Sequence, residues 1–229
     1  MNTLLAPSSR FILCLAAFVC YTDAPLWGQT RVVPGSPAET IRIEVFLRGD
    51  SDLCEGARQY AQQLGQRTRG LEVVFHDVLK DREQLKRLWT LARESGRDKP
   101  VVPAFLCCSQ IHYGFTSEEE NGADVENLFT ADVYTRSSCP RCQSAKRFIS
   151  STLQPRWPAL RFRFYEITYD TAARQRYEEL CRSQGKVPGL PTLHFAGQVI
   201  IGYQGDHITG AQWASLIERA AADREPRSR

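Results

Sequence analysis

Residues 133–142 read VYTRSSCPRC, and this stretch predicts the local fold around two cysteines. A run of β-branched and aromatic residues is typical of a strand. Pro140, directly after Cys139, fits the first turn of a helix, because the N–H that proline lacks has no partner there in any case. We therefore expect a strand, a short turn and a helix that begins beside Cys139, with Cys142 one turn further along.

The same pattern occurs earlier in the chain. Residues 45–54 read VFLRGDSDLC and align with the stretch above at an offset of 88 positions. Pro103 and Pro191 lie 88 positions apart as well. Two independent landmarks at one offset predict a tandem duplication. We expect one copy over residues 40–129 and the other over residues 131–222.

Both copies show the same order of expected elements: strand, helix, strand, helix, two strands joined by a tight turn, and a helix. This order predicts a small mixed sheet in each copy, with helices on both faces. The fold class is therefore α/β, with two tandem domains, and Thr209 is expected to cap the last helix. The main expected strands are 41–47, 71–78, 131–135 and 160–167, the turns are 108–109 and 196–197, and the helices are 54–64, 81–93, 117–129, 142–153, 171–183 and 209–222.

The two ends of the chain differ from its middle. An apolar run, FILCLAAFVCY at 11–21, follows Arg10; it has the length of a signal-peptide core and is short for a membrane span. We expect residues 1–28 to be a signal peptide or an N-terminal anchor, residues 29–39 a linker and residues 223–229 a polar tail. The protein would then be exported, to the periplasm or elsewhere outside the cytoplasm; a cytoplasmic location is the alternative.

Composition excludes several classes of protein. The net charge is +3 and no long basic run occurs, which argues against nucleic-acid binding. No run of 18 apolar residues occurs, which argues against insertion of several spans into a membrane. Eight cysteines, by contrast, are more than a typical cytosolic enzyme carries. Thiol chemistry is therefore the first function to consider.

The spacing of Cys139 and Cys142 suits such chemistry. A thiol at a helix N-terminus lies near unpaired N–H groups and the positive end of the helix dipole. Such a position can lower a thiol pKa from about 8.5 to roughly 3.5–7.5. Arg136 and Arg141 add positive charge nearby. Cys142 can then attack a mixed disulfide formed at Cys139 and resolve it.

The second copy resembles a glutaredoxin of the thioredoxin superfamily, through YTRSSCPRC at 134–142 and VPGLPTLHFAGQVIIGY at 187–203. The resemblance implies two tandem thioredoxin-like domains, the first of them degenerate. It also implies that Cys139 is the nucleophile, Cys142 the resolving thiol, and Pro191 a cis proline whose preceding residue pairs with the bound substrate. The expected contacts to substrate are Pro140, Arg136, Arg141, Leu190 and Pro191.

The resemblance also implies partners. We expect a thiol–disulfide oxidoreductase that acts on protein or small-molecule disulfides and exchanges electrons with a redox partner protein. No metal or organic cofactor is expected. Glutathione stays open as a co-substrate, since residues 202–206 keep only part of the motif that many glutathione-using members have near the last strand. Other readings of the two cysteines are half of a zinc site or a static disulfide. The alternatives for the whole protein are a non-enzymatic docking module and a cytosolic glutathione-dependent glutaredoxin.

The first copy lacks the attacking thiol. Ser51 occupies the place of Cys139, while Cys54 and Pro103 are kept. A serine hydroxyl cannot form a disulfide, so we expect a degenerate domain that serves docking, substrate presentation or solubility. The alternative is that Cys54 acts alone. Adjacent Cys107 and Cys108 are expected to be remote from Ser51, with a spacing unsuited to chelation.

Overall fold

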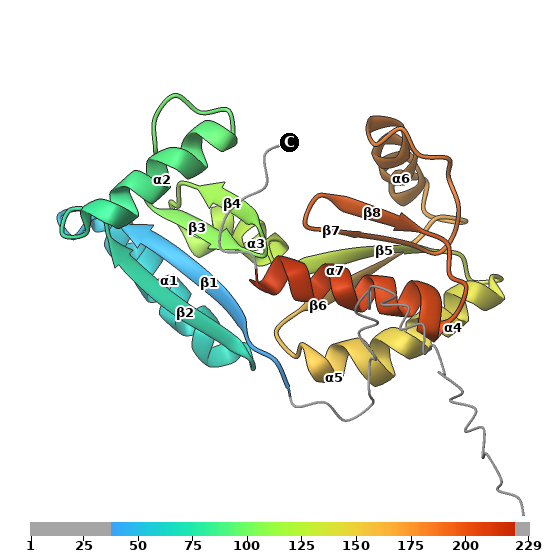
Figure 1. The fold of residues 1–229 in the computed structure, drawn as a ribbon. Helices are drawn as coiled ribbons and strands as arrows, with labels where there is room; N and C mark the ends of the chain where they lie inside the picture. Colours follow the sequence, from blue (N-terminus) through green and yellow to red (C-terminus); the bar gives the residue numbers. More distant parts are fainter. Residues whose placement is uncertain (1–37, 223–229) are drawn as a thin grey trace, which may run out of the picture.

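The computed structural model describes residues 38–222, and Figure 1 shows its two sheets with their helices. The expected signal peptide at 1–28, most of the linker at 29–39 and the polar tail at 223–229 lie outside the described residues. No helix within the described range is both long and apolar enough to cross a membrane.

The first sheet has the strand order β2-β1-β3-β4. β1 pairs in parallel with β2, while β3 is antiparallel to β1 and β4. A parallel neighbour requires a crossover connection, and the first helix supplies it. The elements of this half are β1 (Ile41–Leu47), α1 (Asp52–Arg67), β2 (Leu71–Asp77), α2 (Arg82–Glu94), β3 (Ala104–Cys107), β4 (Gln110–Tyr113) and α3 (Glu118–Asn127).

The second sheet repeats this arrangement in the order β6-β5-β7-β8, with the same parallel and antiparallel pairs. Its elements are β5 (Thr130–Thr135), α4 (Pro140–Phe148), the π-helical turn η1 (Ile149–Leu153), α5 (Gln154–Arg156), β6 (Arg161–Glu166), α6 (Thr171–Ser183), β7 (Thr192–Phe195), β8 (Gln198–Ile201), η2 (Asp206–Gly210) and α7 (Ala211–Ala222). The two sheets confirm an α/β fold of two tandem thioredoxin-like domains.

Each sheet is covered on both faces. In the first domain, α1 packs against the odd-numbered residues of β1, such as Ile43 and Val45, and α2 packs against Phe46 on the opposite face. In the second domain, α4 and α7 cover one face and α6 covers the other, against Tyr134. The alternation follows from the period of two in a strand, which sends neighbouring side chains to opposite faces.

Most expected elements are present with shifts of one to three residues at their ends, but two predictions about helices are wrong. The helix expected over 142–153 is α4 only to Phe148 and continues as the π-helical turn η1. Thr209 does not cap α7: it lies inside η2, and its hydroxyl accepts the backbone N–H of Gln204 at 3.0 Å. That hydroxyl is used by the loop before α7, so it is not free to bond the N-terminal amides of α7.

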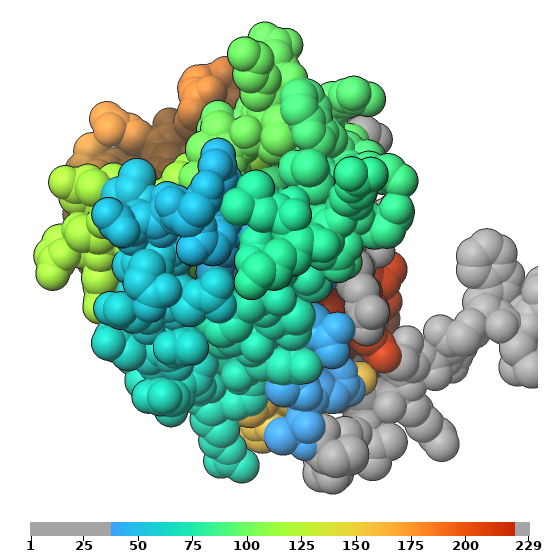
Figure 2. Space-filling model, turned by 90° about the vertical axis from the view of Figure 1, so that its left-hand side faces the viewer, coloured from blue at the N-terminus to red at the C-terminus, as the bar shows by residue number. Residues whose placement is uncertain are grey.

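A single core joins the two domains. Ile43 of β1 and Phe129, which precedes β5, belong to the same buried cluster as Trp157 and Ile217 of the second domain. Seen from the side of the first domain, the blue-to-green surface of that domain faces the viewer, and orange and red parts of the second domain show at its edges (Figure 2). Only two residues separate α3 from β5, so the chain has no linker between the domains. The two halves therefore pack as one body.

Candidate active site

The candidate site lies where β5 ends and α4 begins. Cys139 is the N-cap residue of α4, with an extended backbone (φ −98°, ψ 113°), and Pro140 is in the first turn. The Sγ of Cys139 accepts the backbone N–H of Cys142 at 3.2 Å. Cys139 is 9% exposed and Cys142 is fully buried. The thiol that caps the helix is thus the one that solvent can reach.

The two thiols have opposite electrostatics. Burial raises the pKa of Cys139, but hydrogen bonds from the Cys142 thiol and from the backbone N–H groups of Cys142 and Arg141, with the charge of Arg136, outweigh burial and lower it below its ordinary value. Burial and the hydrogen bond to Cys139 raise the pKa of Cys142 to about 11. The pair therefore favours the thiolate form on Cys139 and the protonated thiol, which donates to it, on Cys142.

The turn before Cys139 is held in place by several hydrogen bonds. The N–H of Cys139 donates to the carbonyl of Arg136 at 3.2 Å, and the side-chain amide of Gln143 donates to the carbonyl of Ser137 at 3.2 Å. Glu166, at the end of β6, bonds Thr168 and also Ser137, and these bonds lower the pKa of its carboxyl group. The position of the thiol therefore depends on the neighbouring strand as well as on α4.

Pro191 lies at the same edge of the sheet as the cysteines. The Leu190–Pro191 peptide bond is cis, as the resemblance implies. Thr192 pairs with Tyr134, so Pro191 is level with the end of β5, from which the loop to Cys139 departs. Within residues 38–222, neither the N–H nor the carbonyl of Leu190 makes a hydrogen bond. This backbone segment is therefore free to pair with an extended peptide.

Tyr177 anchors the loop that carries Pro191, and the sequence did not single it out. Its hydroxyl donates to the carbonyl of Gly189 at 2.6 Å and accepts the N–H of Gly189 at 2.7 Å. The hydroxyl of Thr192 donates to the same carbonyl at 2.6 Å. The ring of Tyr177 packs on Tyr134, with the centroids 5.1 Å apart. Only tertiary contact brings α6 to this loop, so no local sequence signal marks the role of Tyr177.

The structure places three other expected residues, all exposed, at the site. Arg136, Pro140 and Arg141 are exposed around Cys139. Arg136 acts on Cys139 through its charge, whereas Arg141 acts through its backbone N–H. Lys146 is an additional cation that sequence analysis missed, and its charge favours the thiolate form of Cys142. Its position four residues after Cys142, on the same helix face, was a signal that could have identified it.

The first domain repeats this geometry without the nucleophile. Ser51 is the N-cap residue of α1, but its side chain makes no capping hydrogen bond. Cys54 is buried, and its Sγ accepts the backbone N–H of Arg48 at 3.3 Å. Arg136, the equivalent of Arg48, makes the corresponding backbone hydrogen bond to Cys142. The Val102–Pro103 bond is also cis. The backbone of the site is therefore kept although its chemistry is lost.

No three His, Cys, Asp or Glu side chains among residues 38–222 are arranged so that they could hold a metal ion. Cys139 and Cys142 are therefore without further ligands in the part of the chain that the structure describes. Their arrangement suits proton and disulfide exchange between two sulfurs, in which one thiol is stabilised as the anion and its neighbour is kept protonated.

Neither a protein-family model nor a curated protein sequence matches the chain. Among solved structures, the chain is similar to the NTD_N/C domain of alkylhydroperoxide reductase AhpF from Enterococcus faecalis, with 13% identity, 80% of this chain and 91% of that chain covered, and a TM-score of 0.29. It is also similar to a protein disulfide oxidoreductase from Aeropyrum pernix, with 14% identity, 85% and 91% covered, and a TM-score of 0.29. These TM-scores are too low to establish the fold. The assignment of two tandem thioredoxin-like domains rests on the strand order and on the helices that cover each sheet.

Proposed function

We propose that the protein is a thiol–disulfide oxidoreductase that uses Cys139 and Cys142 on protein or small-molecule disulfides. The observation that carries this proposal is the capping contact at α4, in which the Sγ of Cys139 accepts the N–H of Cys142 at 3.2 Å. That contact, with the thiol hydrogen bond from Cys142, lowers the pKa of Cys139. Because the thiolate is the nucleophile in disulfide exchange, the pair is prepared for attack.

The reaction in the reductive direction has two steps. The thiolate of Cys139 attacks one sulfur of the substrate disulfide, forms a mixed disulfide and releases the other sulfur as a thiolate, which takes up a proton. Cys142 then loses its proton and attacks the sulfur of Cys139, which releases the second substrate thiol. The substrate has then gained two electrons, and the protein has lost them by forming the Cys139–Cys142 disulfide. The oxidative direction is the reverse.

Substrate docking is proposed at the Leu190 segment. Its free backbone N–H and carbonyl suit an extended peptide that adds a short strand beside the cis proline. Arg136 and Arg141 are exposed around the sulfur and favour an anionic thiolate during exchange. A redox partner, either a membrane redox protein or a thioredoxin-type reductase, would return the site to its starting state. Glutathione is kept as a candidate small-molecule co-substrate.

The test is an insulin-reduction assay with dithiothreitol as the electron donor. We expect the full-length protein to accelerate reduction and Cys139→Ser to have only the background rate. Incubated with the substrate in the absence of dithiothreitol, Cys142→Ser should accumulate a mixed disulfide with the substrate, because no second thiol of the site remains to resolve it. Cys181→Ser, which changes another buried thiol in the second domain, is the matched control and should keep full activity. Equal rates for the unaltered protein and Cys139→Ser would refute the proposed enzyme.

We also propose that the protein acts outside the cytoplasm, on the strength of the apolar run at 11–21 after Arg10. N-terminal sequencing of the expressed protein tests this. A new N-terminus near residue 29, in an exported fraction, is expected. An intact N-terminus in a soluble cytosolic fraction would contradict it and favour a cytosolic glutaredoxin.

A further inference from the structure

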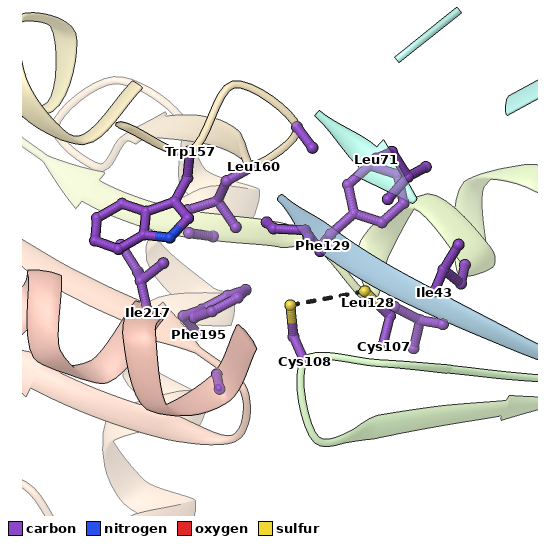
Figure 3. Close-up of a cluster of buried hydrophobic side chains, with 14 of the residues drawn as sticks. Ile43, Leu71, Cys107, Cys108, Leu128, Phe129, Trp157, Leu160, Phe195 and Ile217 are labelled. Carbon is purple, nitrogen blue, oxygen red and sulfur yellow. Dashed lines mark hydrogen bonds between the residues drawn. The ribbon is translucent and has the colours of Figure 1, made fainter. Parts of the chain in front are cut away.

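Two adjacent cysteines of the first domain lie with their sulfurs side by side. The Sγ atoms of Cys107 and Cys108 are 3.7 Å apart, and the side chains are 1% and 3% exposed. Figure 3 shows the two sulfurs facing each other near Ile43 and Leu128 of the first domain and Phe195 of the second. The proposed exchange at Cys139 uses neither of these thiols.

The backbone explains why the two sulfurs meet. Neighbouring residues of a regular strand send their side chains to opposite faces of the sheet. Cys107 ends β3, but Cys108 begins the tight turn to β4 and has a φ of +49°. The left-handed conformation at Cys108 turns its side chain back toward the sulfur of Cys107. In the second domain, the equivalent turn residue, Ala196, has a φ of +50° without a thiol. The turn geometry is thus common to both domains, and the pair of thiols belongs to the first alone.

The pair also borders a hollow of about 180 Å³ in the surface. Both cysteines line it, together with the end of α7, Thr40 just before β1, and polar residues of β1 and β2, among them Arg42 and Glu72. Arg42 and Glu72 form an ion pair at 3.1 Å. A small, uncharged, water-soluble compound could therefore enter through the polar side and reach the sulfurs.

We propose that Cys107 and Cys108 form a chelating dithiol site for trivalent arsenicals. An As(III) centre is pyramidal and holds two sulfur ligands close together on one side, as these thiols already are. Zinc usually needs four ligands, and no group of three metal-ligating side chains occurs within residues 38–222. Two-coordinate mercury(II) places its sulfurs on opposite sides, which the turn at Cys108 prevents. The proposal departs from the expectation that this spacing is unsuited to chelation, because a small pyramidal centre needs only two neighbouring sulfurs.

The binding step is a condensation without a redox change. With methylarsonous acid, both S–H bonds and both As–O bonds to hydroxyl are broken, two As–S bonds form, and the two hydroxyl groups leave with the two thiol protons as two molecules of water. Arsenic stays trivalent and the sulfurs stay in the thiol oxidation state. Burial and the hydrogen bond with Cys108 raise the pKa of Cys107 well above its ordinary value, which favours the neutral thiol on Cys107. The condensation of neutral thiols with a neutral arsenical leaves no buried charge.

The proposal is independent of the proposed enzyme, and the test must separate the two, since Cys139 and Cys142 are also a dithiol. We would use the full-length Cys139→Ser/Cys142→Ser protein, treat it with methylarsonous acid, and wash it with excess 2-mercaptoethanol, which removes arsenic held by single thiols. The tryptic peptide of residues 98–136 contains Cys107 and Cys108 and no other cysteine, so mass spectrometry can locate the adduct.

We expect one arsenical on this peptide and a higher melting temperature of the treated protein, because a ligand that binds the folded state better than the unfolded one stabilises it. Cys108→Ala, which introduces the residue that the second domain has in this turn, should lose both effects. Cys181→Ser should keep both. The absence of an adduct on the native protein would overturn the proposal. So would an adduct that leaves the melting temperature unchanged or lowers it, because the folded hairpin would then be no better a site than the unfolded chain. If Cys108→Ala fails to fold, Cys107→Ser provides the second variant.

Discussion

At the scale of single residues, the two cysteines of one motif differ through their place on α4. Cys139 caps the helix and receives hydrogen bonds, which lower its pKa, whereas Cys142 lies inside the first turn and donates to its neighbour. The same sequence spacing in the first domain gives no such pair, because a hydroxyl at Ser51 replaces the first sulfur. The two domains thus share the backbone of this turn, and the pair of thiols on it belongs to the second domain alone.

The pH dependence of alkylation follows from this difference. Only the thiolate reacts with iodoacetamide, so labelling of Cys139 should rise at a pH below its ordinary pKa of 9.0, while Cys142 should stay unlabelled until about pH 11. Trypsin cleaves after Arg136 and Arg141, which places the two cysteines in separate peptides for mass spectrometry. Labelling of Cys139 with the profile of an unstructured thiol would contradict the helix-capping argument.

The lowered pKa of Cys139 also makes stability depend on pH. A folded-state pKa below the unfolded one stabilises the reduced protein fully above pH 9.0, and this stabilisation is lost as the pH falls through the lowered pKa. The difference in free energy of unfolding between the reduced protein and Cys139→Ser should therefore grow with pH across this window. Urea titrations at several pH values measure it, and a difference that does not change with pH would contradict the expectation.

Tyr177 is predicted to be a positioning residue. Tyr177→Phe removes both hydrogen bonds to Gly189 and should lower the free energy of unfolding by about 1–3 kcal/mol, because buried polar groups lose their partner. The Leu190–Pro191 loop would be held less firmly, so in the insulin-reduction assay the KM should rise more than the kcat falls. Tyr169→Phe is the control, since Tyr169 is 83% exposed. An unchanged KM with reduced stability would limit Tyr177 to a structural role.

At the scale of elements, α4 and η2, the turn that leads into α7, approach closely at a glycine. A Cβ at Gly210, where η2 joins α7, would lie 2.9 Å from the ring of Phe148 on α4, which is 4% exposed. Close packing in a core leaves little room for an added methyl group. The position of α7 over the sheet, and its packing against α4, therefore depend on the absence of a side chain at Gly210.

Gly210→Ala should lower the free energy of unfolding by about 1–3 kcal/mol through overpacking against Phe148. Gly56→Ala is the matched control: Gly56 lies inside α1, a Cβ there meets nothing within 4 Å, and alanine should raise stability by about 0.5–1 kcal/mol. Urea denaturation followed by circular dichroism measures both. A destabilisation of equal size in the two variants would show that packing against α4 is not the cause.

At the scale of the whole molecule, the two domains share one buried core. Trp157 is fully buried and donates its indole N–H to Glu39 at 3.1 Å, just before β1 of the first domain. Arg156 donates to the same carboxylate at 2.7 Å. On the far side of the contact, Glu126 of α3 forms ion pairs with Arg67 of the first domain and Arg161 of the second.

We therefore expect the two domains to unfold together. Trp157→Ala should lower the free energy of unfolding by about 3–5 kcal/mol, the usual cost of removing a large buried ring. Hydrogen exchange measured by mass spectrometry should show reduced protection in both sheets at once. Trp89→Ala is the control, because Trp89 is 37% exposed on α2, away from the contact. Loss of protection confined to the second sheet would show that the domains are independent.

The sequence by itself determined the elements of each domain and the place of the Cys139–Cys142 pair. Strands and helices follow from periods of two and 3.6, which can be read over a few residues, and the offset of 88 positions carried each assignment from one copy to the other. The capping role of Cys139 was likewise local, since the strand, the turn and Pro140 lie within ten residues of one another.

Only the tertiary structure decided which distant segments meet. Tyr177 reaches the Gly189 loop, Trp157 reaches Glu39, and the sulfur of Cys108 turns toward Cys107, and none of these contacts follows from spacing along the chain. Thr209, which local rules favoured as a cap, bonds Gln204 instead, because the π-helical turn places it there. Packing of one element on another fixes such contacts, and its free energy depends on the whole core rather than on any short stretch of sequence.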